Sequence, residues 1–359
     1  MKISTKVIIK SVLFVALLTV GNLLHAQDDE GTPLTISGSV DTYFRTNING
    51  VNTLDVDVDG DGTIDETLIQ SPASSFANQP GFALGMANLV IGMDGEKSGF
   101  VADLVFGPRG TDAVFASTTA SSSIVNQLYA YLNVSDNVTL TVGNFNTFLG
   151  YEVISPTGNF NYSTSYMFSY GPFSHSGLKA DITLGDDASL MLGVLNPTDF
   201  TDFNPDGTYY GGVQLGISGQ YLNVLFGGED VEYFQVDYTG GFDASEDTYI
   251  GINATYNQDL FNGAALYLQQ SFSDDFSLGL RGEYFGDEGV GIIGTGESII
   301  DLTLSANITA GDLTIIPEVR LDSYSVDDVV ITDWDPLNPT AASTANSLSS
   351  FVLAAVYAF

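Results

Sequence analysis

The amino-acid sequence predicts an all-β fold: a transmembrane antiparallel β-barrel of about sixteen strands, with long external loops and short periplasmic turns. Three features of the chain support this prediction. The chain starts with an export signal, and it ends on a strand of alternating polarity whose last residue is Phe359. Between them lie segments of about ten residues in which apolar and polar side chains alternate, joined by tight turns and long loops.

Residues 1–26 have the organisation of a signal peptide. Three lysines precede an apolar run at residues 11–20, and Leu24-His25-Ala26 forms a cleavage site before Gln27. The apolar run is too short to cross a bilayer as a helix, and no later segment offers 18 uninterrupted apolar residues. We therefore expect an exported protein of the bacterial outer membrane that crosses the membrane several times with strands.

The composition of the remaining 333 residues narrows the class of protein. Six basic side chains stand against 44 acidic ones, a formal charge of −38, which excludes nucleic acid as a partner. With 18 Tyr, 23 Phe and 39 Gly the chain is too aromatic for a disordered acidic protein. Acidic surfaces are also typical of proteins from salty habitats. The absence of cysteine excludes disulfides, a thiol catalyst and a lipid anchor on an N-terminal cysteine.

Sixteen segments are predicted as strands of the barrel, residues 27–359. They are residues 34–45, 82–93, 100–106, 127–134, 138–145, 178–184, 190–195, 210–217, 221–226, 233–238, 249–256, 264–272, 276–285, 299–308, 313–324 and 348–359. An acidic external loop, residues 48–79, follows the first strand, and tight turns such as Ser135-Asp136-Asn137 join strands in pairs. An even strand number is what single-chain bacterial barrels require.

Alternation along the strands assigns each side chain to a face. In residues 276–285, Leu278, Leu280 and Tyr284 share one face, and Ser277, Gly279, Arg281 and Glu283 share the other. A soluble sandwich would show the same period with water on its polar side, so a secreted soluble β protein stays open as an alternative. A barrel of about sixteen strands would enclose an aqueous channel with the polar face lining it.

The end of the chain resembles the terminal signal of outer-membrane barrels. Phe351, Leu353, Ala355, Tyr357 and Phe359 fall on one face of the final strand. In such barrels a closing Phe, preceded by alternating aromatic or apolar residues, is read by the barrel assembly machinery. The resemblance implies that Tyr357 and Phe359 act as this assembly signal.

Longer motifs resemble the family named putative beta-barrel porin-2. They are VGNFNTFLGYE at residues 142–152, NFNYS at 159–163, RGEYFGD at 281–287, SGSVDTY at 37–43 and FGP at 106–108. The first two look like the third-loop region of that family, and the order of the motifs is a stronger signal than any one of them. The resemblance covers nearly the whole mature chain. It implies an outer-membrane pore and assigns no solute.

The sequence DVDGDGTID at residues 57–65 matches the first nine positions of an EF-hand loop. The predicted calcium ligands are Asp57, Asp59, Asp61, Thr63 and Asp65. The twelfth position is Leu68 and not Glu, so Asp55 or Glu66 would have to supply the missing ligand. No cofactor is otherwise required. The alternative is a solvated acidic loop without a metal.

Residues 148–176 are too long for a hairpin turn and are rich in Tyr, Phe, Asn and Ser. Loops of that length usually have a function. Folded inward, this one would narrow the channel and place Glu152 at a constriction; the alternative is an external cap. His175 is the one histidine outside the signal peptide, and we expect it to be a surface residue, because a triad or a zinc site needs partners at defined spacing.

The face assignment also predicts the charges of the channel wall. Its acids are Asp41, Asp103, Asp181, Asp237, Glu283, Asp301, Glu318 and Asp322, and its bases are Arg45, Lys179, Arg281 and Arg320. Acids outnumber bases, so cations should be preferred. A second arrangement would cluster the bases opposite an acidic loop and create a transverse field across the channel.

These features predict a porin-like channel for the passive diffusion of small hydrophilic solutes, with no enzymatic step. The expected partners are outer-membrane lipids, the assembly machinery and small hydrophilic solutes or cations, and the chain could form a homo-oligomer. A structural or adhesive barrel without a transport role is the main alternative. An enzymatic barrel would need a Ser or Asp with a His at the outer rim.

Overall fold

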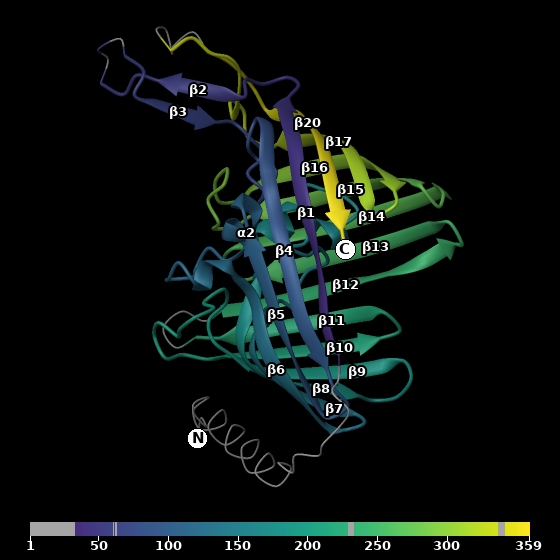
Figure 1. The fold of residues 1–359 in the computed structure, drawn as a ribbon. Helices are drawn as coiled ribbons and strands as arrows, with labels where there is room; N and C mark the ends of the chain where they lie inside the picture. Colours follow the sequence, from purple (N-terminus) through teal and green to yellow (C-terminus); the bar gives the residue numbers. More distant parts are fainter. Residues whose placement is uncertain (1–32, 60, 62, 229–232, 337–341) are drawn as a thin grey trace.

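The computed structural model describes residues 33–359 except residues 60, 62, 229–232 and 337–341. The predicted signal peptide, residues 1–26, lies outside the described residues. Sixteen antiparallel strands form one closed barrel in which neighbours in sequence pair with each other (Figure 1). The predicted fold class is therefore confirmed.

Most strands are slightly longer than the alternation alone predicts. The barrel strands are β1 (Leu34–Asn47), β4 (Gly81–Asp94), β5 (Ser98–Phe106), β6 (Val125–Ser135), β7 (Val138–Asn146), β8 (Ser174–Thr183), β9 (Ala188–Leu195), β10 (Tyr210–Ile217), β11 (Gln220–Gly227), β12 (Tyr233–Ser245), β13 (Thr248–Asn257), β14 (Phe261–Ser273), β15 (Phe276–Asp287), β16 (Glu297–Ala310), β17 (Leu313–Tyr324) and β20 (Ser347–Ala358). The extra residues lie at the strand ends. They pair with the neighbouring strand, but their side chains do not alternate between apolar and polar, so the sequence pattern does not predict them as strand.

The first and last strands close the barrel. β1 pairs with β20 from Ser39 to Asn47, and Gly38 and Phe359 exchange two backbone hydrogen bonds of 2.9 and 3.0 Å. A Cβ at Gly38 would lie 2.9 Å from the Phe359 ring and 2.0 Å from the Asn88 carbonyl oxygen, so this position has no room for a side chain. Pairing of the two terminal strands leaves the barrel without a free edge.

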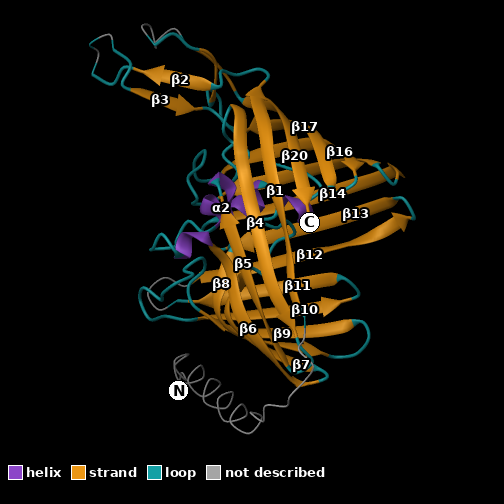
Figure 2. Ribbon diagram, viewed as in Figure 1, coloured by secondary structure: helices purple, strands orange, loops and turns teal. Residues whose placement is uncertain are grey.

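The two ends of the barrel differ in their connections. On one side, turns of two to four residues join β4 to β5, β6 to β7 and each later pair up to β16 and β17. The other side carries the long connections, residues 48–80, 107–124, 147–173, 196–209 and 325–346 among them. Figure 2 shows short helices within these connections, including α2 (Pro108–Ala113) and α3 (Tyr166–Tyr170). No helix among the described residues is both long and apolar enough to cross a membrane.

An arm of two hairpins projects from the loop side (Figure 1). The first hairpin, β2 (Thr53–Val56) with β3 (Glu66–Ile69), belongs to the connection after β1, and the second, β18 (Val330–Asp333) with β19 (Ser343–Ala345), belongs to the one before β20. The side chain of Gln70 joins them, because its amide donates to the Ile331 carbonyl at 2.9 Å and accepts from the Ile331 N–H at 2.7 Å. The predicted acidic loop thus carries a sheet of its own.

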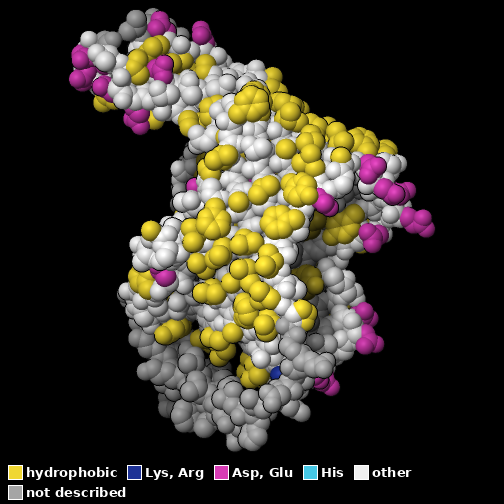
Figure 3. Space-filling model, viewed as in Figure 1, with side chains coloured by type: hydrophobic (Ala, Val, Ile, Leu, Met, Phe, Trp, Pro, Cys, Tyr) yellow, Lys and Arg dark blue, Asp and Glu magenta, His cyan; other side chains and the backbone are white. Residues whose placement is uncertain are grey.

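The outward face of the barrel is apolar and the inward face is polar. Figure 3 shows apolar side chains spread over the outer surface. In β15, Leu280 and Tyr284 point outward and are 42% and 48% exposed, while Arg281 and Glu283 point inward and are buried. A closed barrel with this arrangement satisfies its backbone hydrogen bonds internally and presents hydrocarbon on its outside, as a bilayer requires.

The facing predicts opposite effects for two arginine substitutions in β15. Leu280→Arg should impair assembly, since it places a charge in hydrocarbon at a cost of roughly 2–4 kcal/mol near the midplane. Ser277→Arg, on the inward face, serves as the matched control and should assemble normally. The yield of the heat-modifiable folded form on a gel after refolding into vesicles measures both. Equal yields would contradict the facing.

Candidate functional site: a loop inside the barrel

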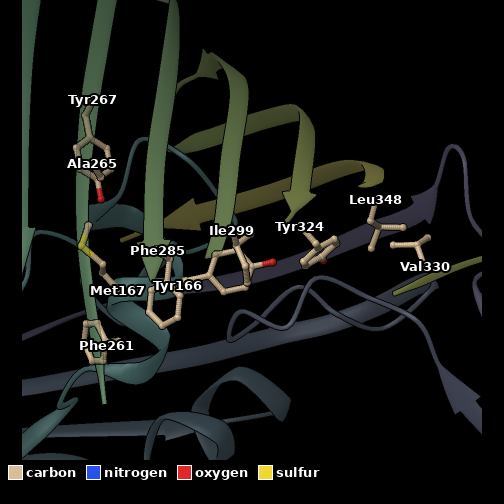
Figure 4. Packing of buried hydrophobic residues seen from close by; sticks show 10 residues of the cluster. All are labelled: Tyr166, Met167, Phe261, Ala265, Tyr267, Phe285, Ile299, Tyr324, Val330 and Leu348. Atoms are coloured by element: carbon tan, nitrogen blue, oxygen red, sulfur yellow. The ribbon is translucent and has the colours of Figure 1, made fainter. Parts of the chain in front are cut away.

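Residues 147–173, here called the inner loop, connect β7 to β8 and fold into the barrel. Its helix α3 packs Tyr166 and Met167 against inward side chains of β14 and β15, including Phe261 and Phe285 (Figure 4). The Tyr166 ring lies 5.7 Å from the Phe285 ring. The interval predicted from the sequence was 148–176, and its last three residues belong instead to β8.

Carboxylates of the barrel wall bind the backbone of the inner loop. Glu318 accepts from the N–H groups of Tyr162 and Ser163 at 2.8 and 3.1 Å. Glu283 accepts from Tyr166 and Met167, the first residues of α3, at 2.8 and 2.7 Å. Both carboxylates are at most 2% exposed. They satisfy N–H groups that would otherwise be buried without a partner.

Two arginines of the wall pair with other buried carboxylates and bind the loop as well. Arg281 pairs with Asp301 and with Glu152 of the loop, at 2.7 Å in each case. It also donates to the Ser163 carbonyl at 2.7 Å. The second arginine, Arg320, pairs with Asp322 at 2.7 Å.

Arg320 also extends the contact between the inner loop and the first long connection. Its Nη1 donates to the Thr164 carbonyl at 2.8 Å and to the Ser74 hydroxyl at 2.9 Å. Arg281 and Arg320 are at most 1% exposed. Their charges therefore hold the interior of the barrel together and do not face open water.

Arg109 of α2 also binds the inner loop, and it was not among the residues predicted from the sequence. Its guanidinium lies over the rings of Phe76 and Tyr162, 4.4 and 5.3 Å from their centroids. It donates to the Ile154 carbonyl at 2.9 Å and to the Tyr162 carbonyl at 3.3 Å. The one available signal was its place directly after the FGP motif.

Tyr162 joins the inner loop to β1. Its hydroxyl donates to the Asp41 carboxylate, and its ring lies 5.7 Å from the Tyr43 ring. Burial and the neighbouring Asp41 charge raise the pKa of Tyr162 above its ordinary value, so the hydroxyl stays protonated and remains a donor.

The predicted wall residues fall into two groups. The buried group contains Asp41, Arg45, Asp103, Asp237, Arg281, Glu283, Asp301, Glu318, Arg320 and Asp322. Arg45 donates to Asn47 at 2.5 Å, and Asp103 accepts from Asn126 at 2.6 Å. The open group is the ion pair of Lys179 and Asp181, 3.0 Å long, whose side chains are 25% and 43% exposed.

This distribution corrects two expectations. Glu152 does not present a free charge at a constriction: it is 5% exposed, paired with Arg281, and accepts from the Ser165 N–H at 2.8 Å. The bases do not form an open cluster that faces an acidic loop, because Arg45, Arg281 and Arg320 are buried in hydrogen bonds. Only Lys179, of the four, stays partly open.

A hollow of about 370 Å³ lies on the inward side of β6, β7 and β8. It is lined by polar and aromatic side chains, Gln127, Tyr129, Tyr131, Asn133, Thr139, Thr141, Phe145, Asn146, Lys179, Asp181 and Asp94. The open ion pair belongs to this hollow. Water-accessible charge on the wall is therefore concentrated on the side of the turns, away from α3.

His175 was expected at the surface, and this expectation was wrong. It lies in β8, is fully buried, and its Nε2 is 2.9 Å from the Thr147 hydroxyl. The Phe148 ring packs 5.1 Å from the imidazole. The inner loop turns back over β8 and covers this histidine, which the local sequence could not indicate.

The predicted calcium ligands lie on the loop that joins β2 to β3. Carboxylate oxygens of Asp57, Asp59 and Asp61 lie within 4.8 Å of one another. Asp61 accepts from the Thr63 N–H at 2.7 Å and Asp65 from the Val58 N–H at 2.8 Å. Residues 60 and 62 lie outside the described residues. Carboxylate oxygens suit a hard cation such as Ca²⁺, and calcium binding stays a prediction.

Tyr357 and Phe359, the predicted assembly signal, are 42% and 57% exposed at the end of β20. The Tyr357 hydroxyl donates to Asp312 on the neighbouring turn at 3.3 Å. Both side chains lie on the outward face at the turn side of the barrel, opposite the arm.

Removal of one buried arginine should loosen the interior. Arg281→Met leaves Glu152 buried without its cation and Asp301 with Arg320 alone, at 3.6 Å, so we expect the free energy of unfolding to fall by about 3–5 kcal/mol. Lys179→Met, in the open ion pair, is the matched control and should cost at most about 1 kcal/mol. Urea titration of the folded fraction measures both. Similar losses in the two variants would show that burial of the pair does not matter.

Calcium binding can be tested by calorimetry on the refolded protein. Wild type should give a saturable heat of Ca²⁺ binding that disappears in Asp57→Asn/Asp59→Asn/Asp61→Asn, because three oxygen ligands lose their charge. Asp247→Asn/Asp274→Asn/Asp275→Asn removes the same charge from the turns and should leave the heat unchanged. An unchanged signal in the first variant would remove the site.

Comparison with known proteins agrees with this architecture. Outer-membrane expressed OmpT of Vibrio cholerae is 12% identical, with a TM-score of 0.51 over 93% of this chain and 99% of that one. A mutant of Rh. blastica porin is 13% identical, with a TM-score of 0.51 over 91% and 100%. At these identities the likeness concerns the fold alone. No curated protein matches the sequence. The family model described as "Putative beta-barrel porin-2, OmpL-like" matches residues 33–359, and the chain belongs to this family.

Proposed function

We propose that the protein is an outer-membrane porin that lets small hydrophilic solutes diffuse passively, with a preference for cations. The observation that carries the proposal is the closed sixteen-strand barrel with an apolar outside, a polar inside and a loop folded into its interior. A barrel of this size is wide enough to leave water-filled space beside a loop that folds into it. Family membership supports the same function.

The proposed preference for cations rests on the sign of the charged side chains that are exposed to solvent. Acidic side chains are exposed on six of the seven tight turns: Asp94, Glu96, Asp136, Asp186, Asp187, Asp243, Glu246, Asp247, Asp274, Asp275 and Asp312. Lys97 is the one base on these turns. Figure 3 shows acidic groups along the edge of the molecule where the turns lie (right). Such a rim attracts cations to the periplasmic mouth.

Transport through this barrel needs no covalent step. The buried Glu283, Glu318, Arg281 and Arg320 bind the inner loop and are fully engaged there.

The relative with a solved trimer form, OmpT of Vibrio cholerae, supports the proposal that this chain also forms a homo-oligomer. Tyr357 and Phe359 are proposed as the residues that the assembly machinery reads.

A structural or adhesive role is the second candidate, and the arm favours it. The two hairpins extend beyond the barrel and carry exposed apolar residues such as Val58, which is 69% exposed, next to acidic ones. A surface of this kind suits contact with another molecule. Conductance separates the candidates, because an adhesive barrel needs no open channel.

The reversal potential across a KCl gradient in a planar bilayer tests the porin proposal. At low salt the potential should have the sign of a cation-selective channel, and at 1 M salt it should shrink because the screening length falls to about 3 Å. Asp247→Asn/Asp274→Asn/Asp275→Asn should reduce the selectivity. Asp57→Asn/Asp59→Asn/Asp61→Asn, with the same charge change on the arm, should reduce it less.

Two outcomes would contradict the proposal. An anion-selective potential at low salt would refute the cation preference while leaving a channel. No conductance at any salt concentration, from protein that shows the heat-modifiable mobility of a folded barrel, would favour the structural or adhesive role.

A further inference from the structure

A groove of about 530 Å³ lies on the outward side of β6, β7, β8 and β9, near the loop side of the barrel. It is lined by Ser122, Val125, Leu128, Val142, Gly143, Asn144, Ser176, Gly177, Leu178, Val194, Asn196, Thr201, Asp202 and Tyr209. Its volume is within the range of small-molecule sites. Because it faces away from the lumen, the proposed channel does not explain it.

Two rows of side chains cross the groove. Val142, Leu178 and Val194 are direct partners on β7, β8 and β9 and form an apolar row. One step nearer the loops, Asn144 is the partner of Ser176, whose hydroxyl oxygen lies 3.1 Å from the Asn144 side-chain oxygen. The outward face therefore changes from apolar to polar within the groove. A membrane protein shows this change where hydrocarbon meets the head groups.

A ledge of loop residues borders the polar end of the groove. Asp202 accepts from the hydroxyls of Thr118 and Ser122, both at 2.7 Å, and so joins residues 107–124 to residues 196–209. The Thr201 carbonyl accepts from the Ser176 hydroxyl at 2.9 Å, which fixes the ledge to β8. The hydrogen bonds from Thr118 and Ser122 lower the pKa of Asp202, so the ledge carries a negative charge.

We propose that this groove binds one outer-leaflet lipid with an uncharged, hydroxyl-rich head group, that is, a glycolipid. Its acyl chain lies along Val142, Leu178 and Val194, and its sugar contacts the amides and hydroxyls at the ledge. The occupant must be amphipathic because the groove itself is apolar at one end and polar at the other. A lipid is the amphipathic molecule that surrounds an outward barrel face.

The charges of the groove decide the head group. Among the described residues, the lining contains hydroxyls, side-chain amides and the Asp202 carboxylate, and it contains no Lys or Arg. An anionic phosphate would meet a negative charge without a counter-charge, whereas sugar hydroxyls can both donate to Asp202 and accept from the amides. The proposal therefore distinguishes glycolipid from anionic phospholipid.

Native mass spectrometry of the mature protein, released from nanodiscs, tests the site. The probes are a monoglucosyl diacylglycerol and a phosphatidylglycerol with the same acyl chains. Wild type should retain one glucolipid, and half-saturation should need about ten-fold less of it than of phosphatidylglycerol. Val142→Trp fills the groove with an apolar side chain and should weaken glucolipid retention about ten-fold.

Leu304→Trp is the matched control. Leu304 lies on β16, across the barrel from β8, and is 50% exposed on the outward face. It should retain the glucolipid as wild type does. If Val142→Trp fails to show heat-modifiable mobility, Val194→Trp replaces it, and the comparison of the two lipids on wild type needs no variant.

Three results would overturn the proposal. Equal retention of the two lipids by wild type would refute the choice of head group. Equal glucolipid retention by Val142→Trp and Leu304→Trp would show that the groove is not the site. A dimer or trimer mass that is lost in Val142→Trp, with no lipid bound, would assign the groove to a second copy of the chain. All three readouts are independent of conductance.

Discussion

The interior of this barrel depends on the pairing of wall carboxylates with backbone N–H groups of the inner loop. A loop packed inside a barrel loses the water that would solvate its backbone, and each unpaired buried group is costly. Glu283 and Glu318 meet this requirement with two hydrogen bonds each. On the same wall Arg281 pairs with Asp301 and Arg320 with Asp322, so these buried charges are balanced as well.

This pairing separates the charges that hold the structure from the charges that a solute meets. The arginines and carboxylates between β15 and β17 are buried in contacts with each other and with the inner loop. Open charge is found on the turns and at the pair of Lys179 and Asp181. Substitution at the turns can therefore change the field at the mouth without disturbing the packing of the inner loop.

The fold could be predicted from the sequence because apolar and polar side chains alternate along each strand, which is a local pattern. Strands such as β10 and β17 have the bounds that alternation indicates, and the terminal Phe359 indicates closure. The contacts of the inner loop could not be predicted, because Arg281 lies 129 residues from its partner Glu152 and no local pattern links them. The surroundings of Arg109 and His175 could not be predicted for the same reason. Arg109 contacts residues that are distant in the chain, and His175 is covered by a loop that folds back over it.

The arm gives the protein a built-in optical reporter of complete folding. Its two hairpins come from opposite ends of the chain and meet only once β1 lies beside β20. The indole of Trp334, the single tryptophan of the chain, donates to the Asp55 carbonyl at 2.8 Å across that junction. The fluorescence of this one residue should therefore follow the joining of the first strand to the last, without any added label.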